Sequence, residues 1–244
     1  MKRKMAKLLS ILAFTISCGG NSGNNSDSYI NPYATTVNGE IIQQSQTASG
    51  FTLNGTKLSF ITAFSIENNK LVYSSAVINP DGTFKLFLKK ELKYAFVLFD
   101  KEGNPILYIT QYSNNVIVIE DNTYLKILLK TLNDGTFQVV NIEHDANSYL
   151  DWEALLEDSD NNNLPDYAEE DHNGNGLPDY DENNDGIFDG IEDTDGDGII
   201  EGSDDTDNDH LPDPIDDDDD DDGIPDDEDD DDDNDGIPDD EDDD

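Results

Sequence analysis

Seven stretches in the last third of the sequence repeat one pattern of oxygen-bearing side chains over twelve positions. Positions 1, 3, 5, 9 and 12 are Asp, Glu or Asn, position 6 is usually Gly, and position 7 is Leu or Ile. We call these stretches loops one to seven; they cover residues 158–169, 171–182, 181–192, 193–204, 205–216, 218–229 and 231–242. Alternate oxygens in a tightly turning loop converge on one centre, which is the arrangement that a hard cation such as Ca²⁺ binds.

The spacing predicts six ligands per loop, because Ca²⁺ takes about six to eight oxygens at ~2.3–2.6 Å. Position 7 would use its backbone carbonyl, and position 6 needs a positive φ, which Gly adopts freely and which Asn163 and His210 tolerate better than most residues. The predicted metal ligands are, at position 1, Asp158, Asp171, Asp181, Asp193, Asp205, Asp218 and Asp231; at position 3, Asp160, Asn173, Asn183, Asp195, Asp207, Asp220 and Asp233; at position 5, Asn162, Asn175, Asp185, Asp197, Asp209, Asp222 and Asp235; at position 7, Leu164, Leu177, Ile187, Ile199, Leu211, Ile224 and Ile237; at position 9, Asp166, Asp179, Asp189, Glu201, Asp213, Asp226 and Asp239; and at position 12, Glu169, Glu182, Glu192, Asp204, Asp216, Asp229 and Asp242.

The alternative is a disordered acidic tail, which composition alone would favour. It does not explain why Gly, then Ile or Leu, often Pro, and then Asp recur in phase. In loops six and seven the surrounding poly-Asp admits other frames, and only Gly223-Ile224-Pro225 and Gly236-Ile237-Pro238 set the phase.

The charge of the chain is divided sharply between its two parts. The formal net charge is -45, and all 13 Lys and Arg lie at or before Lys130. From Asp158 to Asp244 there are 43 acidic residues and no Lys or Arg. This segment lacks the apolar residues for a core and repels itself, so either it stays disordered or cations hold it together. Nucleic acid is excluded as its partner.

The loops follow one another without room for flanking helices, since their starts are 13, 10, 12, 12, 13 and 13 residues apart. That spacing excludes EF-hands and disfavours dockerins. Residues 158–244 instead resemble thrombospondin type 3 repeats, as in Asp193-Thr-Asp195-Gly-Asp197-Gly198-Ile199, although the cysteines of that family are absent. The resemblance implies a chain wrapped around a row of calcium ions with little secondary structure.

The loops must be carried by the preceding segment, which reads as an all-β domain. Short runs of β-branched and aromatic residues predict eight strands, separated by turns such as Asn79-Pro80-Asp81-Gly82. The runs are Phe60–Ile66, Leu71–Ile78, Thr83–Leu88, Tyr94–Phe99, Ile106–Thr110, Val116–Ile119, Tyr124–Leu129 and Phe137–Ile142. The expected fold class is mainly β: an N-terminal antiparallel β-sandwich followed by an irregular, calcium-organised repeat region.

The turn at Asn79–Phe84, with Tyr94 and the later Gly103-Asn104-Pro105, gives a second resemblance. Residues 36–110 are similar to the transthyretin-like, carboxypeptidase-regulatory-type sandwich. That family is usually a spacer or binding module, so the resemblance supplies no catalytic residues.

The N-terminus is typical of a targeting signal. Lys2, Arg3, Lys4 and Lys7 precede the short apolar run Leu8–Ile16, and Cys18 follows as the single cysteine of the chain. This resembles a bacterial lipoprotein signal, in which the Cys is lipidated, although Thr15 stands where that family usually has Leu. An ordinary secretory signal with an incidental Cys is the alternative.

The sequence therefore predicts five segments: a lipoprotein signal peptide at 1–17, a flexible tether at 18–36, the sandwich at 37–145, a short helical connector at 146–157 and the calcium repeats at 158–244. We expect a secreted, non-enzymatic protein, lipid-anchored through Cys18 at the bacterial outer membrane or cell surface. Calcium would stiffen the repeats into a stalk. The alternative is an adhesion or ligand-binding protein, in which the sandwich binds an extracellular protein or glycan and the acidic tail is a spacer or disordered.

Overall fold

The computed structural model describes residues 31–43, 52–53, 56–109, 115–119, 124–131, 137–144, 147–150, 157–194, 196–226, 229 and 231. The predicted signal peptide, Cys18, most of the tether and most of the helical connector lie outside the described residues. So do Asp195 and all of loop seven except Asp231. No helix in the described part of the chain is long and apolar enough to cross a membrane.

Eleven strands are described, and all eight predicted strands are among them. They are β1 Ala34–Gln43, β2 Thr52–Leu53, β3 Thr56–Glu67, β4 Lys70–Val77, β5 Thr83–Lys89, β6 Lys93–Asp100, β7 Pro105–Tyr108, β8 Asn115–Val118, β9 Tyr124–Thr131, β10 Phe137–His144 and β11 Asn147–Leu150. The mainly β fold class is confirmed.

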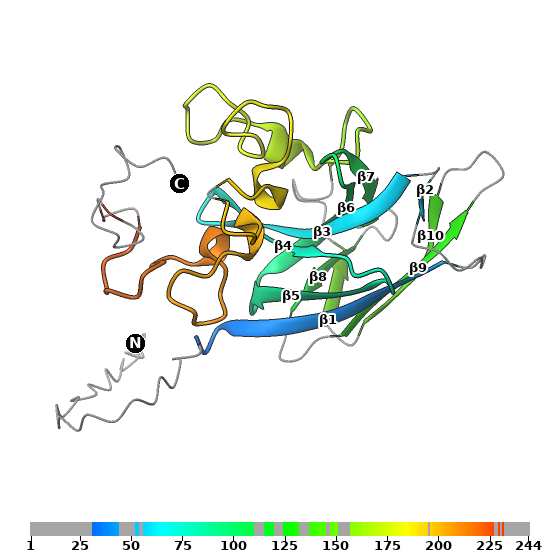
Figure 1. The fold of residues 1–244 in the computed structure, drawn as a ribbon, viewed down its shortest axis with the longest axis horizontal. Coiled ribbons are helices and arrows are strands. Elements are labelled where there is room, and N and C mark those ends of the chain that lie inside the picture. The colour runs from blue at the N-terminus through cyan, green and yellow to red at the C-terminus, as the bar shows by residue number, and fades with distance from the viewer. Residues whose placement is uncertain are drawn as a thin grey trace, which may run out of the picture.

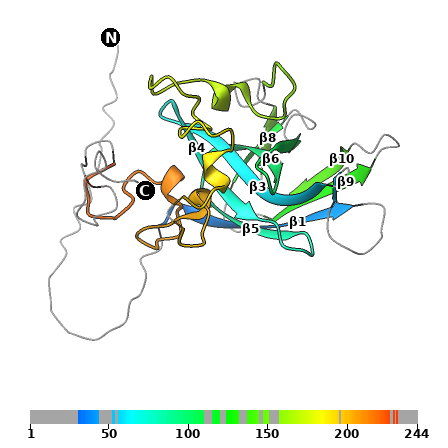
Figure 2. The same cartoon turned by 45° about the horizontal axis from the view of Figure 1, so that its top comes forward.

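The strands form two sheets, seen one above the other in Figure 2. One has the order β10-β9-β1-β5, and the other has the order β11-β8-β6-β3-β2, with β4 beside β3 and β7 beside β6. The pairs are antiparallel except β1 and β9, which run parallel.

Two local expectations were wrong. The strand β1 begins at Ala34, inside the expected tether, because Thr35 and Thr36 pair with Leu88 and Phe87 of β5. The helical connector expected at 146–157 is a strand in its first part, because Asn147–Leu150 forms β11, in which Tyr149 pairs with Val116 of β8.

The sheet that contains β6 is buried on both faces. Tyr94, Phe96 and Leu98 belong to the core between the two sheets, which also includes Val37 of β1 and Leu86 of β5. The alternate residues Ala95, Val97 and Phe99 belong to a second apolar cluster, formed with residues of the acidic region. We call this side of the sheet the outer face; Phe60, Phe64, Tyr73, Val97 and Phe99 line it.

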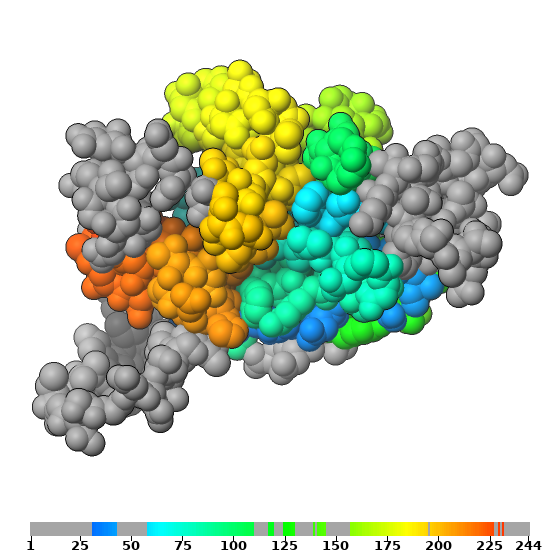
Figure 3. Space-filling model, viewed as in Figure 1, coloured from blue at the N-terminus to red at the C-terminus, as the bar shows by residue number. Residues whose placement is uncertain are grey.

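Residues 157–244 are called the tail, and its described part runs across the outer face (Figure 1). It contains the four short 3₁₀ turns η2 Asp166–Glu169, η3 Asp189–Ile191, η4 Glu201–Ser203 and η5 Asp213–Ile215. The space-filling view shows it as a continuous band from yellow-green to orange beside the strands (Figure 3).

Candidate metal sites in the acidic tail

Loops one to six share one set of hydrogen bonds in the predicted phase. The position 6 amides donate to the position 1 carboxylates at 3.0 to 3.3 Å. The position 7 amides donate to the position 5 side-chain oxygens at 2.6 to 2.8 Å. Both sets bend the backbone around the side chains of positions 1 and 5, so the predicted ligands converge from both arms of each loop.

Two further bonds close each of these loops. The position 9 carboxylate accepts a hydrogen bond from the position 2 amide at 2.6 to 3.0 Å. The position 9 amide donates to the carbonyl of the residue before position 1 at 2.9 to 3.2 Å. The pattern places loop six at Asp218, which is the frame that Gly223-Ile224-Pro225 predicts.

The backbone turns to positive φ twice in each of loops one to six. Position 6 has φ from 76° to 98°, carried by Asn163, Gly176, Gly186, Gly198, His210 and Gly223. Position 4 has φ from 54° to 81°, carried by Asn161, Gly174, Asn184, Gly196, Asn208 and Asp221. Sequence reasoning missed position 4, although Asn or Gly stands there in five of these six loops and both types tolerate the left-handed region.

Loops five and six bring three carboxylates together. One oxygen each from Asp205, Asp207 and Asp209 lies within 4.8 Å of the others, and Asp218, Asp220 and Asp222 form an equivalent group. The Oδ1 atoms of Asp205 and Asp218 are buried and accept no hydrogen bond. A buried carboxylate oxygen without a donor is costly unless a cation meets it.

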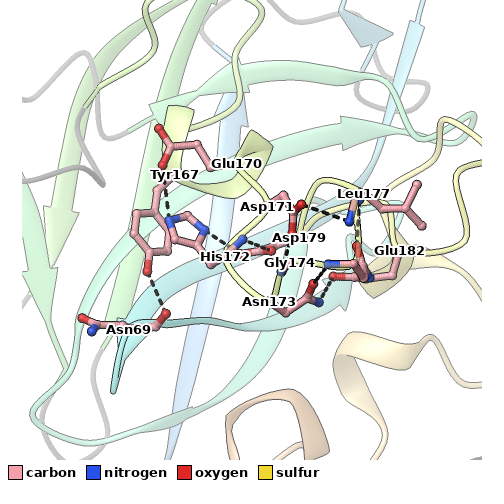
Figure 4. A network of polar contacts seen from close by, with 12 residues as sticks. Asn69, Tyr167, Glu170, Asp171, His172, Asn173, Gly174, Leu177, Asp179 and Glu182 are labelled. Atoms are coloured by element: carbon pink, nitrogen blue, oxygen red, sulfur yellow. Dashed lines mark hydrogen bonds and ion pairs between the residues drawn. The ribbon is translucent and has the colours of Figure 1, made fainter.

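Loops one to three have amides among the ligands and Glu at position 12. The Asn162 amide donates to Glu169 at 2.5 Å, and the Asn183 amide donates to Glu192 at 2.9 Å. In loop two the amides of Asn173 and Asn175 both donate to Glu182 (Figure 4). The position 12 carboxylate therefore lies over the side chains of positions 3 and 5, which is where it would complete the predicted set of ligands.

In loops one, two and five the position 2 side chain also contacts the position 9 carboxylate. In loop two His172 donates through its backbone to Asp179, and its ring Nδ1 lies 2.7 Å from the other oxygen of that carboxylate. The imidazole also stacks on Tyr167 with ring centroids 3.8 Å apart, and Tyr167 donates through its hydroxyl to the Asn69 carbonyl (Figure 4).

The electrostatics of the loops favour bound positive charge. Burial, with Asp207 nearby, raises the pKa of the Asp205 carboxyl. Burial, with neighbouring carboxylates adding to it, also raises the pKa of Asp189 to about 6 and that of Asp216 to about 7. These crowded carboxylates are therefore costly to ionise when no cation balances them.

Alternate loops supply the side chains that hold the tail on the sheet. Leu164 and Ala168 of loop one, and Phe188 and Ile191 of loop three, are buried in the cluster of the outer face. Leu211 and Ile215 of loop five are buried against Ala34 and Val72. The even loops differ: Ile199 and Ile224 at position 7 of loops four and six are 45% and 42% exposed. The expectation of a projecting stalk is therefore wrong for loops one to five.

The packing around Phe188 shows how closely the tail contacts the outer face. Its ring centroid lies 5.1 Å from that of Phe64, 4.9 Å from that of Tyr73 and 5.5 Å from that of Phe99. Gly190 and Gly202 lie so near β4 that a Cβ would come within 2.5 Å of the Tyr73 ring and the Ser75 hydroxyl, respectively. Glycine is required at both positions because a side chain would push the tail off the strand.

Polar ties add to the apolar contacts. Lys89 forms ion pairs with Glu67 at 3.0 Å and with Asp217 at 2.9 Å, and its side chain is 13% exposed. The Ser203 hydroxyl donates to the Ser75 carbonyl at 2.6 Å. The sandwich and the tail thus share an interface with both apolar and charged contacts.

Comparisons with known proteins leave the family of this chain open. No family model and no curated protein matches it. Among solved structures it is similar to the fimbrial anchor protein Mfa2 from Porphyromonas gingivalis, with 14% identity and a TM-score of 0.31 over 48% of each chain. A leucine-rich repeat protein from Bacteroides thetaiotaomicron VPI-5482 aligns with 14% identity and a TM-score of 0.26, over 40% of this chain and 12% of that one.

The aligned region spans about half the length of the fimbrial anchor protein. A likeness of this size assigns no function to the chain. The resemblances to thrombospondin type 3 repeats and to the transthyretin-like sandwich remain predictions.

Proposed function

We propose that the tail binds calcium ions, one in each loop, and that these ions give the tail its fold. The observation that carries this proposal is the pair of three-carboxylate groups in loops five and six, each with a buried oxygen that accepts no hydrogen bond. Carboxylate, amide and backbone oxygens are the ligands that Ca²⁺ prefers, whereas softer metals prefer nitrogen and sulfur ligands. The predicted ligands of loop seven extend the same chemistry on sequence alone.

The role of calcium in this proposal is structural. In the described part of the tail, the buried apolar residues pack against the sandwich and not against a core of the tail's own. A filled loop would neutralise part of the carboxylate repulsion and hold positions 7 to 11 in the shape that packs on the sheet. Calcium would thereby connect local loop closure to the burial of Leu164, Phe188 and Leu211.

Isothermal titration of the calcium-stripped full chain with calcium tests this function. We expect at least six ions to bind per chain, accompanied by a rise in melting temperature. A filled site at free calcium ~100 times its Kd adds about 2.7 kcal/mol to the free energy of unfolding. Magnesium at equal ionic strength is the control, because its small octahedral shell fits such loops less well. No heat of binding and no change in melting temperature would refute the proposal.

We further propose that the protein is a lipoprotein exposed at the bacterial surface. The support is the order of Lys2 to Lys7, the apolar run Leu8–Ile16 and Cys18. Metabolic labelling with a radioactive fatty acid should mark the wild-type chain and leave a Cys18→Ala variant unlabelled. Equal labelling of both chains would contradict lipidation at this residue.

A further inference from the structure

We infer that the tail is a calcium-dependent cover for an aromatic face of the sandwich. With calcium in the loops the outer face is closed, and without calcium it is open to solvent. This inference rests on the proposed calcium binding. It adds that calcium decides which surface the sandwich presents.

The aromatic face belongs to the sandwich and needs no contact with the tail to exist. The strands β3, β4 and β6 pair with one another through their own ladders, as in Phe64↔Tyr73 and Phe64↔Ala95. Their other side is fixed by the core between the two sheets, through Ile61, Ala76 and Phe96. Loss of the tail would therefore leave a folded sheet with its outer face exposed.

The cover is a separate layer from the sheet it hides. The described tail contains short 3₁₀ turns and adds no strand to either sheet in the described part of the chain. Its anchors are side chains of loops one, three and five, together with ties such as the hydrogen bond from Ser203 to the Ser75 carbonyl. A layer held by side chains can leave without breaking the ladders beneath it.

Loop three couples the cation to the cover most directly. Phe188 stands between Ile187, whose carbonyl is a predicted ligand, and Asp189, a predicted ligand through its carboxylate. Its ring lies between Phe64, Tyr73 and Phe99. The segment that would bind the ion is thus the segment that seats the ring, and opening the loop moves the anchor.

The first test measures the binding of anilinonaphthalene sulfonate, a dye that fluoresces on exposed apolar surface, to the full chain. We expect weak fluorescence in calcium and a several-fold increase in chelator. The variant Phe188→Ala removes an anchor and no ligand, so its fluorescence should be raised even in calcium. The matched control Tyr33→Ala also truncates an aromatic side chain, but at a 62% exposed position outside the loops and the outer face, and it should behave like the wild type.

A second test keeps the inference falsifiable if Phe188→Ala fails to fold. In a Cys18→Ser chain, the pair Ser75→Cys and Ser203→Cys places thiols on β4 and η4, where the native residues are in contact. With oxidised glutathione as the oxidant, a disulfide should form faster in calcium than in chelator, and the locked chain should no longer gain dye fluorescence on chelation. A full gain of fluorescence in the locked chain would overturn the cover.

The two proposals fail in different ways. If titration shows no calcium binding, the proposed function is wrong. If calcium binds with the expected stoichiometry while dye binding and disulfide formation are the same in calcium and in chelator, the function stands and the cover is overturned.

Discussion

The odd and even loops of the tail have the same ligand template and differ in what their apolar residues do. Leu211 of loop five is 1% exposed, whereas Ile199 of loop four, at the same template position, is 45% exposed. Side-chain oxygens stand at positions 1, 3, 5 and 9 in both kinds of loop. Cation binding is thus asked of every loop, whereas the fully buried apolar side chains come from loops one, three and five.

The largest expected difference between odd and even loops comes from truncating the position 7 side chain in one loop of each kind. We expect Leu211→Ala to lower the free energy of unfolding in calcium by about 2–5 kcal/mol, because it leaves a cavity beside Val72 and Ile215. We expect Ile199→Ala to change it by less than about 0.5 kcal/mol. Denaturant titration of both variants measures the difference, and equal losses would show that burial does not alternate.

The overlap of loops two and three provides the next prediction. The Glu182 carboxylate closes loop two over Asn173, while the Glu182 amide donates to Asp189 of loop three at 2.7 Å. Glu182→Pro removes the carboxylate and the amide hydrogen together, so it should weaken calcium binding in both loops. Glu182→Gln keeps the amide hydrogen, so it should weaken binding in loop two alone.

Calorimetric stoichiometry at a fixed free calcium concentration separates the two variants. We expect a loss of about two ions for Glu182→Pro and about one ion for Glu182→Gln. The same loss in both would mean that the shared residue does not couple its loops.

The effect of pH should reverse between the ion-free and the calcium-bound chain. In the closed tail without bound ions the pKa values of Asp189 and Asp216 are raised, to about 6 and about 7, so the closed tail holds protons that the open tail releases. Without calcium the closed tail should therefore become less stable relative to the open tail as pH rises from 5 to 8. With calcium the stability should instead increase as pH rises, because at low pH protons compete with calcium for the ligands. Melting curves at the two pH values, with and without calcium, check the sign; parallel trends would contradict it.

The smallest expected effect concerns position 4. Asn184 has φ of 59° and an exposed side chain, so Asn184→Ala should cost about 1 kcal/mol through backbone strain alone. The control Asn184→Gly should be neutral or better. Thermal unfolding in calcium measures both variants, and an Ala variant as stable as the Gly variant would remove the role given to this position.

The sequence predicts the frame of the tail because Gly at position 6 and Ile or Leu at position 7 are local requirements of the turn. It does not predict where the tail lies, because nothing in the sequence distinguishes Phe188 and Ile215 from the other apolar loop residues; only the fold shows that the sandwich buries them. Gly190 and Gly202 were the overlooked signal, as neither is needed for a positive φ and both mark close contact with β4.

The sandwich shows a related limit. The alternation of Phe60, Thr62, Phe64 and Ile66 marks a buried face of β3, but the interior of the sandwich takes the opposite face, with Ile61 and Ala63. When both faces are covered, alternation no longer tells inside from outside. The strand β1 was missed because Asn38-Gly39 is typical of a turn, whereas here Phe84 of the neighbouring strand fills the space over Gly39.

A contact of the first described residue, Asn31, places the tail beside the N-terminal end of the sandwich. The Asn31 amide donates to the Asp209 carbonyl at 3.1 Å, so the fifth loop ends up beside the entrance of the chain into the sandwich. A molecule attached by its N-terminal end would therefore carry loop five near its point of attachment. Loops one to five would then broaden the base of the protein, and the ends of β9 and β10 that lie away from the start of β1 would become the part held out to the surroundings.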